Sequence, residues 1–547
     1  MAGFKLQTFS GQAPKVYARL LPDDMAQIAT NCRLDSGRLE PWKTNASATI
    51  SIVDSYSISA QTKTLFRYSS SIWMGSNYDI NIVRSPVAED PHERIYISGF
   101  TYPQMTTASI VGASQHYRLG IPKPADLTSV TLSPVTSANV DTEVPQSRSY
   151  IFTYVSAYGE EGVNCDAEAA QVVDVHTDQT VTLDFPPNPS GNYNLALKRV
   201  YRTDAGGTYR FVQDVPIATD TFADTVTEVN LGEEIPTSTF DAPPDDDAAD
   251  HKDGPLLGLV SMPNGILAGF SGQTVSFSEA FQPHAFPDEY KLTVKSDIVA
   301  LAPLNTGLLV LTKEKPAIIQ GLDPSSMSMM EVDSSLSCVA KRSVVDMGEF
   351  VMYASPDGIV MANDSGLSLI TEQSLTRDQW QEYTPSSIVA FQWEGHYIAF
   401  YTNSSESKGF IFDPRGGKNS FVKLDFHATA GFNDLENDQL YLVVGGSVVK
   451  FAEGSADSNF VWRGKKFYTP RPINPAVAKV QCDSYSPNPT MKLYADGVLK
   501  HTQSVTNSNT FRLPSGYKAN EFEIELAGSV AINEVCVYES AEEIGVQ

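Results

Sequence analysis

The sequence predicts an all-β protein, and three observations support this fold class. Five segments repeat one pattern: an apolar run of about five residues, a tight turn, then a second apolar run. The first runs begin at Ile266, Leu308, Phe350, Tyr397 and Leu440, so the steps between them are 42, 42, 47 and 43 residues. The chain of 547 residues contains 36 Gly, 33 Pro, 24 Tyr and 26 Phe, a composition typical of strands and turns. Long helical patterns are nearly absent.

The period of the repeat predicts a β-propeller, because propeller blades are adjacent hairpins that recur about every 40–50 residues. The turns agree with this, since Pro356-Asp357-Gly358 and Gly445-Gly446-Ser447 supply the backbone angles that a hairpin needs. A β-sandwich with evenly spaced hairpins is the alternative. Sandwich strands recur about every 8–12 residues without a second, longer period, so we favour the propeller.

A chain of this length exceeds what one core can organise, and four segments are predicted. Residues 1–140 form an N-terminal arm and the first propeller strands, which are expected to pair with late strands and close the ring. Residues 141–245 form an inserted sandwich, residues 246–460 the main propeller blades, and residues 461–547 a C-terminal β-domain. Ala495-Asp496-Gly497 marks a hairpin in the last segment.

The inserted segment is predicted to be an immunoglobulin- or fibronectin type III-like β-sandwich. It holds about seven short strands with alternating aromatic residues in about a hundred residues. Asp204-Ala205-Gly206-Gly207 is the expected turn of one of its hairpins. The segment ends in DAPPDDDAADHKDGP, whose Pro and Asp content predicts a solvated tether.

Two short helices are candidates within this β-rich chain. One would begin near Asp23 and extend to Ala29, with acidic residues at its positive end. The other lies within Thr371 to Trp380.

The net charge of −26, from 39 basic and 65 acidic residues, excludes a protein that grips nucleic acid through its phosphates. The negative charge has two interpretations. It keeps the protein soluble, or it forms an acidic surface that repels DNA and lets it pass without binding. The five cysteines are scattered without a CxxC pair, which argues against a disulfide framework and a zinc site. The start of the chain has no signal-peptide pattern, and no stretch approaches the ~20 apolar residues that span a bilayer. We therefore expect assembly in a reducing cytoplasm and no membrane-spanning segment.

The sequence nominates no catalytic, cofactor-binding or metal-binding residue. No two of its eight histidines lie closer than 24 residues, and it has no HExxH, GxSxG, P-loop or GxGxxG motif. Asp245-Asp246-Asp247 could offer oxygen ligands to a divalent cation, but consecutive carboxylates in a tether do not converge on one point. Ser355-Pro356-Asp357-Gly358 is similar to the Asp-box of sialidase propellers, yet it lacks the closing Thr-Trp and serves as a hairpin turn. We predict that the protein is not an enzyme and holds no cofactor.

A local basic cluster comprises Lys198, Arg199, Arg202 and Arg210. Alternation along a strand would split these residues between two faces, which disfavours a DNA-binding patch. The interpretations that remain are ordinary surface charge and a contact with an acidic neighbouring subunit.

The order of several segments resembles a family of virion proteins from short-tailed bacteriophages, the tail nozzle or tail tubular proteins. The chain opens with FSGQAPKVYARLLPDDMAQIATNCRLDSGRLEPW, followed by YIFTYVSAYGEEG and KRVYRTDAGGTYRFVQDVP. Next come PLLGLVSMPNGILAGFSGQTVSFSEAFQPHAFPDEY, LLVLTKEKPAIIQGLDPSSMSM and YASPDGIV. The resemblance covers roughly residues 1–460, with a weaker echo in the C-terminal ADG and RLPSG segments. It is carried by the order of the segments and not by a single motif.

The resemblance implies a structural virion protein located in the phage tail. By this resemblance, six copies would form a homohexameric ring below the tail adaptor or tube protein, conduct double-stranded DNA during genome ejection, and offer attachment surface to tail fibres. It carries no catalytic residues. The alternative functions are a tailspike-like, polysaccharide-degrading protein, which should show a carboxylate-lined and aromatic-rich pocket, and a receptor-binding β-protein.

Overall fold

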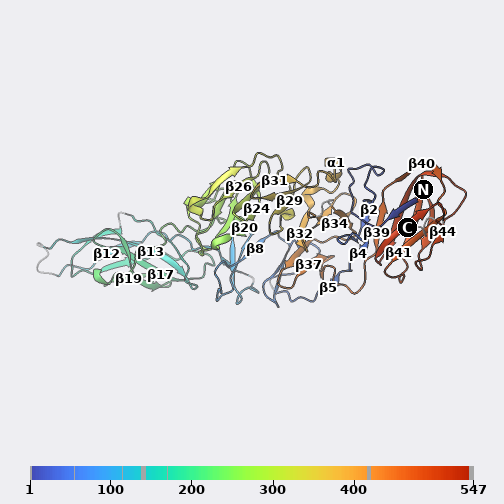
Figure 1. Cartoon of the computed structure of the whole chain (residues 1–547). Coiled ribbons are helices and arrows are strands. Elements are labelled where there is room, and N and C mark those ends of the chain that lie inside the picture. The colour runs from blue at the N-terminus through green and yellow to red at the C-terminus, as the bar shows by residue number, and fades with distance from the viewer. Residues whose placement is uncertain are drawn as a thin grey trace. The chain divides into compact units, whose positions relative to one another are not determined.

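The computed structural model is nearly all β, with many antiparallel sheets and a single short α-helix among the described residues (Figure 1). It describes residues 3–540 and 542, except 54–55, 114, 137–142, 169–170 and 416–419. The predicted boundary between residues 140 and 141 lies outside the described residues. The chain divides into two compact units. The first comprises Met1–Asp79, Leu311–Pro316 and Glu331–Gln547, and the second comprises Ile80–Val310 and Ala317–Met330.

The second unit contains three sheets of four strands each, formed by strands that follow one another in the sequence. The sheet β8-β9-β10-β11 comprises Asn81–Arg84, Ile95–Ser98, Gln104–Thr106 and Tyr117–Arg118. The sheet β20-β21-β22-β23 comprises Leu257–Ser261, Leu267–Ser271, Thr274–Phe277 and Lys291–Thr293. The sheet β24-β25-β26-β27 comprises Ile298–Leu304, Gly307–Thr312, Ala317–Gln320 and Ser328–Glu331. A shared apolar core joins the last two sheets, in which Leu308, Val310 and Ile319 are fully buried.

Two further sheets of the second unit enclose a separate apolar core. One consists of β12 (Ser129–Leu132), β16 (Val181–Asp184) and β19 (Thr221–Asp224). The other joins β14 (Glu161–Asn164), β13 (Gln146–Ser156), β17 (Leu195–Thr203) and β18 (Tyr209–Pro216), with β15 (Val172–Val175) also paired to β13. The predicted turn after Thr203 connects β17 to β18 as an antiparallel hairpin. Tyr150, Phe152 and Val200 lie in the core between the two sheets.

In the first unit, four sheets use consecutive strands, and early strands of the chain join late ones. Two consist of consecutive strands alone: β28–β31 (Val345–Asp346, Val351–Ala354, Ile359–Asn363, Gly366–Leu369) and β6–β7 (Thr64–Arg67, Trp73–Ser76). A third contains β36 (Ala430–Asp434), β37 (Gln439–Val444) and β38 (Ser447–Lys450) and is completed by the early strand β5 (Ala46–Ser47). The fourth run, β32–β35 (Val389–Trp393, His396–Thr402, Ser407–Asp413, Ser420–Leu424), continues through a parallel pairing to β2 (Ala26–Thr30).

A further early strand, β1, forms the edge of a sheet of C-terminal strands with the order β1-β46-β41-β44. Strand β1 (Gly3–Leu6) pairs with β46 (Ile532–Tyr538), and Figure 1 shows the blue N-terminal strand among the red C-terminal ones. The remaining C-terminal strands are β39 (Phe460–Gly464), β40 (Phe467–Ile473), β41 (Val477–Cys482), β42 (Thr490–Ala495), β43 (Val498–Ser504), β44 (Phe511–Arg512) and β45 (Ala519–Gly528). The predicted Ala495-Asp496-Gly497 turn connects β42 to β43.

All five hairpins predicted from the repeat are present as antiparallel pairs. They are β21–β22, β25–β26, β29–β30, β33–β34 and β37–β38. At Ser355-Pro356-Asp357-Gly358 the Ser355 amide donates to the Gly358 carbonyl at 2.8 Å, which closes the turn of β29–β30. This segment is therefore a hairpin turn, as predicted.

One predicted helix is wrong and the other is confirmed in part. Residues 26–30 form strand β2, which pairs with the distant strand β39 and has a register shift between Ala26 and Ile28. The second candidate contains α1 (Arg377–Gln381), capped by Thr376 and Gln379 in a capping box. The other helical turns are short 3₁₀ segments: Glu228–Asn230, Pro263–Gly265, Asp288–Tyr290, Pro324–Ser326, Lys341–Ser343 and Pro385–Ser387.

The five cysteines are free and buried. Burial raises the pKa of the Cys338 and Cys165 thiols to about 12, so both behave as apolar core groups. Across the described residues, no helix is both long and apolar enough to cross a membrane.

Candidate functional site: a buried histidine between two aspartates

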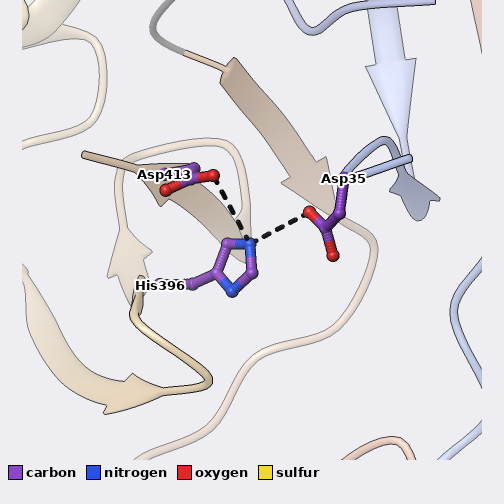
Figure 2. A group of neighbouring side chains, drawn as sticks. All are labelled: Asp35, His396 and Asp413. Carbon is purple, nitrogen blue, oxygen red and sulfur yellow. Dashed lines mark hydrogen bonds and ion pairs between the residues drawn. The ribbon is translucent and has the colours of Figure 1, made fainter. Parts of the chain in front are cut away.

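The first unit brings one histidine and two aspartates together from three places in the sequence (Figure 2). His396 is the first residue of β33, directly after the Glu394-Gly395 turn, whose two positive φ angles of 48° and 76° reverse the chain. Asp413 is the last residue of the paired strand β34. Asp35 belongs to the turn between the short paired strands β3 (Cys32–Arg33) and β4 (Glu40–Pro41). The cluster therefore joins an N-terminal hairpin to the β33–β34 hairpin.

The imidazole lies between the two carboxylates. His396 Nε2 is 3.2 Å from Asp35 Oδ1 and 4.0 Å from Asp413 Oδ2. Dashed lines mark both contacts in Figure 2. The His396 side chain is 4% exposed, whereas that of Asp35 is 39% exposed. The edge of the imidazole also packs against Trp42, with ring centroids 6.1 Å apart. The histidine is a core residue whose Nε2 faces one partly exposed aspartate, Asp35, and one mostly buried aspartate, Asp413, which is 18% exposed.

Each carboxylate uses its second oxygen to hold an arginine. Arg33 Nε lies 3.0 Å from Asp35 Oδ2, and its Nη2 lies 3.0 Å from Glu394. Arg415 Nε lies 3.1 Å from Asp413 Oδ1. The arginines thereby orient both carboxylates so that the remaining oxygens face His396.

The pKa of Asp35 is held below its ordinary value. The hydrogen bond from His396 is the largest cause, burial opposes it, and the charges of His396 and Arg33 add to the lowering. The carboxylate therefore stays ionised in the folded protein at neutral pH.

One nitrogen and two carboxylate oxygens form a donor set that divalent transition metals accept, so we tested this site against a metal. A metal would take the lone pair of His396 Nε2 and leave the proton on Nδ1. Nδ1 is buried and has no hydrogen-bond partner among the described residues, whereas metal-ligating histidines donate from their other nitrogen. Two guanidinium groups also hold the same carboxylates. The geometry fits a hydrogen-bonded clasp, with Nε2–H donated to Asp35, better than it fits a metal centre.

The predicted basic cluster lies in the second unit, and its interpretation as surface charge or subunit contact is wrong for Lys198 and Arg202. Lys198 and Arg202 are buried in the sandwich: Lys198 Nζ donates to the Thr219 carbonyl, and Arg202 pairs with the wholly buried Asp224. Arg210 pairs with Asp204 of its own hairpin turn. Asp224 belongs to β19, so the sheet that contains β19 encloses this part of β17, and no local pattern in the sequence predicted that enclosure.

Arg199 belongs to a second network of the sandwich, centred on the buried Glu161. Glu161 Oε1 accepts hydrogen bonds from Thr153 and Tyr201, each at 2.7 Å, and Oε2 accepts from Arg199 at 2.8 Å. Arg199 also forms a two-point pair with Asp214, at 2.7 and 2.9 Å. Both carboxylate oxygens of Glu161 thus accept hydrogen bonds from side chains of this protein. Such a network holds the neighbouring strands together.

The Asp-rich connector is not a free tether along its whole length. Arg118, the last residue of β11, reaches Asp245 at 3.1 Å and Asp246 at 2.7 Å, and it lies 3.9 Å above the Tyr102 ring. The sequence analysis expected the three consecutive carboxylates not to converge on one point, but Asp245 and Asp246 both bind the same nitrogen, Arg118 Nη1. Two of them hold an arginine that sequence reasoning did not identify, because Arg118 lies 127 residues away from Asp245.

We call the cluster of Asp35, His396 and Asp413 the His396 clasp. The sequence pointed to none of these three residues. The only local signal is the turn before β33, which places a histidine at the start of a buried strand. Asp35 lies 361 residues from His396, and no spacing rule links them. The predicted absence of catalytic, cofactor and metal residues stays a prediction.

No family model matches this chain, and no curated protein matches it. Among solved structures it is similar to BBS1N in complex with ARL6DN, at 9% identity and a TM-score of 0.29, over 75% of this chain and 96% of that one. It is also similar to the dihydro-heme d1 dehydrogenase NirN, at 12% identity and a TM-score of 0.24, over 68% of this chain and 74% of that one. It is also similar to the N-terminal domain of Nup159, at 11% identity and a TM-score of 0.24, over 60% of this chain and 86% of that one. Likenesses of this degree carry no argument about this chain.

Proposed function

We propose that this protein is a structural subunit of a short bacteriophage tail, in which six copies form the nozzle ring that conducts the genome during ejection. The observation that carries the proposal is the ordered resemblance of segments across residues 1–460. In the virion the subunit would meet the tail adaptor or tube protein on one side and tail fibres on its surface.

The arrangement of the sheets supports a rigid conduit. We interpret the successive four-stranded sheets as propeller blades and the region around β12–β19 as an immunoglobulin-like insert. The pairing of early strand β5 with late strand β38 is the kind of closure that a propeller uses to remove an exposed sheet edge.

The charge supports a passage that does not retain DNA. Six copies of a chain with net charge −26 carry a formal charge of −156. Many of the carboxylates are exposed, as at Glu233, Glu234, Asp297 and Asp333. Like charges repel over a Debye length of about 8 Å at physiological ionic strength, so an acidic wall would keep a duplex off its surface.

The polar clusters that the fold does bring together support a structural role. The His396 clasp, the Arg202–Asp224 pair and the Glu161 network each connect different strands through groups that are already paired with one another. Such groups hold strands in place. A general acid or a nucleophile would instead have to face the substrate.

A reconstruction of the virion tests the proposal, together with ejection measured on altered particles. We expect the chain in a ring around the DNA path. Reversing several wall carboxylates to Lys should slow ejection, most strongly at low salt, where screening is weak. A trimer at a spike tip, away from the DNA, would contradict the whole proposal, and normal ejection of the reversed particles at every ionic strength would remove its electrostatic part.

A further inference from the structure

Two open strand edges lie close together in the C-terminal part of the first unit. Strand β43 is the last strand of the largest sheet, and β44 is the last strand of the sheet β1-β46-β41-β44. The rings of His501 in β43 and Phe511 in β44 are 6.3 Å apart. No residue of β43 is buried, and its first two residues, Val498 and Leu499, are 55% and 47% exposed. An open edge with exposed apolar side chains is a surface that another chain can cover.

Three exposed cations border these two edges. Arg512 ends β44, and Lys518 follows it in the segment that leads to the next strand. Lys500 of β43 reaches the same segment, because its Nζ lies 5.4 Å from the centre of the Tyr517 ring. All three cationic side chains are exposed. We call Lys500, Arg512 and Lys518 the basic edge.

The acidic residues near the end of the chain do not neutralise the basic edge. Five glutamates of this part form ion pairs with other cations: Glu521, Glu523, Glu525, Glu534 and Glu539. Among the described residues, no carboxylate forms an ion pair with Lys500, Arg512 or Lys518. The basic edge is therefore a positively charged surface on a strongly acidic protein.

The distribution of charge along the chain selects the partner. Residues 461–547 contain nine basic and nine acidic residues, so the whole net charge of −26 comes from residues 1–460. Two basic edges repel each other, and so do two acidic surfaces, whereas a basic edge and an acidic surface attract each other. A nucleic acid would also attract the cations, but its phosphates give no role to the exposed Val498 and Leu499. Apolar side chains beside charges are typical of a contact between proteins.

We propose that the basic edge binds an acidic surface of a second copy of this chain. Lys500, Arg512 and Lys518 would pair with carboxylates from residues 1–460 of that copy, and the apolar start of β43 would pack beside them. This contact joins two different surfaces, so the copies follow one another head to tail, which is the way in which rings are built. The inference rests on the proposed function for the closure of the ring, and on the charges for the contact itself.

Sedimentation velocity of the full chain tests this proposal at about 0.1 M and about 1 M NaCl, where the Debye length is about 10 Å and 3 Å. The variant Lys500→Glu/Arg512→Glu/Lys518→Glu should raise the dissociation constant of self-association about 10-fold or more at the lower salt concentration. The difference from the wild type should nearly vanish at the higher one, because salt screens exposed charges. The corresponding triple Gln variant should show a smaller rise. Since the three side chains are exposed, both variants should keep the melting temperature of the wild type.

Lys43→Glu/Lys63→Glu/Arg377→Glu is the matched control, because it changes the net charge equally at exposed cations of the same unit. It should alter the dissociation constant by less than about 3-fold. The proposal is overturned if the wild type does not self-associate, or if the basic-edge variant and the control weaken the association equally. It is also overturned if the basic-edge variant loses binding to a short DNA duplex, followed by fluorescence anisotropy, while its self-association is unchanged.

The same experiment separates this inference from the proposed function. A ring that the basic-edge variant forms as well as the wild type would remove the inference and leave the proposed function. A head-to-tail polymer that depends on the basic edge but closes no ring would support the inference and contradict the proposed function.

Discussion

Two polar clusters of this protein differ in their access to water. One is the Arg202–Asp224 ion pair of the sandwich, and the other is the His396 clasp of the first unit. Arg202 and Asp224 are both 0% exposed, whereas the clasp places a buried His396 against aspartates that keep contact with water. Removing one partner of the enclosed pair leaves a charge that water cannot reach. Removing Asp35 from the clasp opens a position that water already reaches, because the Asp35 side chain is 39% exposed. The same kind of contact should therefore matter much more in the sandwich.

The largest effect is expected from Asp224→Asn, which leaves the Arg202 guanidinium buried and uncompensated. Asp224 also accepts a hydrogen bond from Tyr150 at 2.8 Å. The free energy of opening of the sandwich should fall by about 3–5 kcal/mol. Hydrogen exchange at the amides of β13 and β17, followed by mass spectrometry, measures this opening.

Arg210→Met is the matched control, because it breaks an ion pair of the same sandwich whose arginine is 40% exposed. It should change the opening free energy by less than about 1 kcal/mol. The double variant Arg202→Met/Asp224→Leu should recover most of the loss, since Nε and Nη2 of Arg202 have no hydrogen-bond partner among the described residues. Equal losses for Asp224→Asn and Arg210→Met would refute the comparison.

Truncating a buried apolar side chain gives a reference value for the loss of unfolding free energy, with which the losses at both polar sites can be compared. Leu309 in β25 is 0% exposed, and Leu309→Ala should lower the free energy of unfolding by about 2–5 kcal/mol. Leu322 is 48% exposed, so Leu322→Ala should stay within about 0.5 kcal/mol of the wild type. Urea denaturation followed by far-UV circular dichroism distinguishes the two, and a loss at Leu322 as large as that at Leu309 would count against the assigned burial.

For the clasp, His396→Ala removes the hydrogen bond to Asp35 and the packing against Trp42. We expect a loss of about 1–3 kcal/mol, smaller than that of Asp224→Asn. All five tryptophans lie in the segments of the first unit, at positions 42, 73, 380, 393 and 462, so tryptophan fluorescence in urea reports on this unit alone. An unchanged urea midpoint for His396→Ala would show that the clasp stabilises nothing.

The smallest effect concerns pH and follows from the lowered pKa of Asp35. A carboxyl whose folded pKa lies below its unfolded value, about 3.9, stabilises the fold above that pH and loses this contribution as pH falls through the folded pKa. The wild type should therefore lose fluorescence-detected stability below about pH 4 more steeply than Asp35→Asn does. Parallel acid profiles for the two proteins would contradict this assignment.

Local features of the fold were predictable from the sequence, and long-range ones were not. The five hairpins, the turn at Ser355 and the turn at Ala495 depend on residues close in the sequence, so apolar periodicity and turn residues predicted them. The strand at Ala26 was mistaken for a helix, because its pairing with β39 comes from residues more than 430 positions away. Arg202 and Lys198 were read as surface charge for the same reason: only the neighbouring strands show that their positions are enclosed.

The candidate site escaped prediction because each of its members is ordinary in its own segment. Asp35 is one carboxylate in a polar turn, Asp413 ends a strand, and His396 follows a common Glu-Gly turn. Only the fold brings them within 4.8 Å of one another.

The mass of the assembled protein tests the central claim, that this chain forms the nozzle ring of a phage tail, most directly. Native mass spectrometry of the purified assembly, supported by negative-stain images, should give six copies of the 59.6 kDa chain, close to 358 kDa, arranged around an axial opening. A stable trimer, or a monomer that forms no ring either alone or with the rest of the tail, would contradict the account.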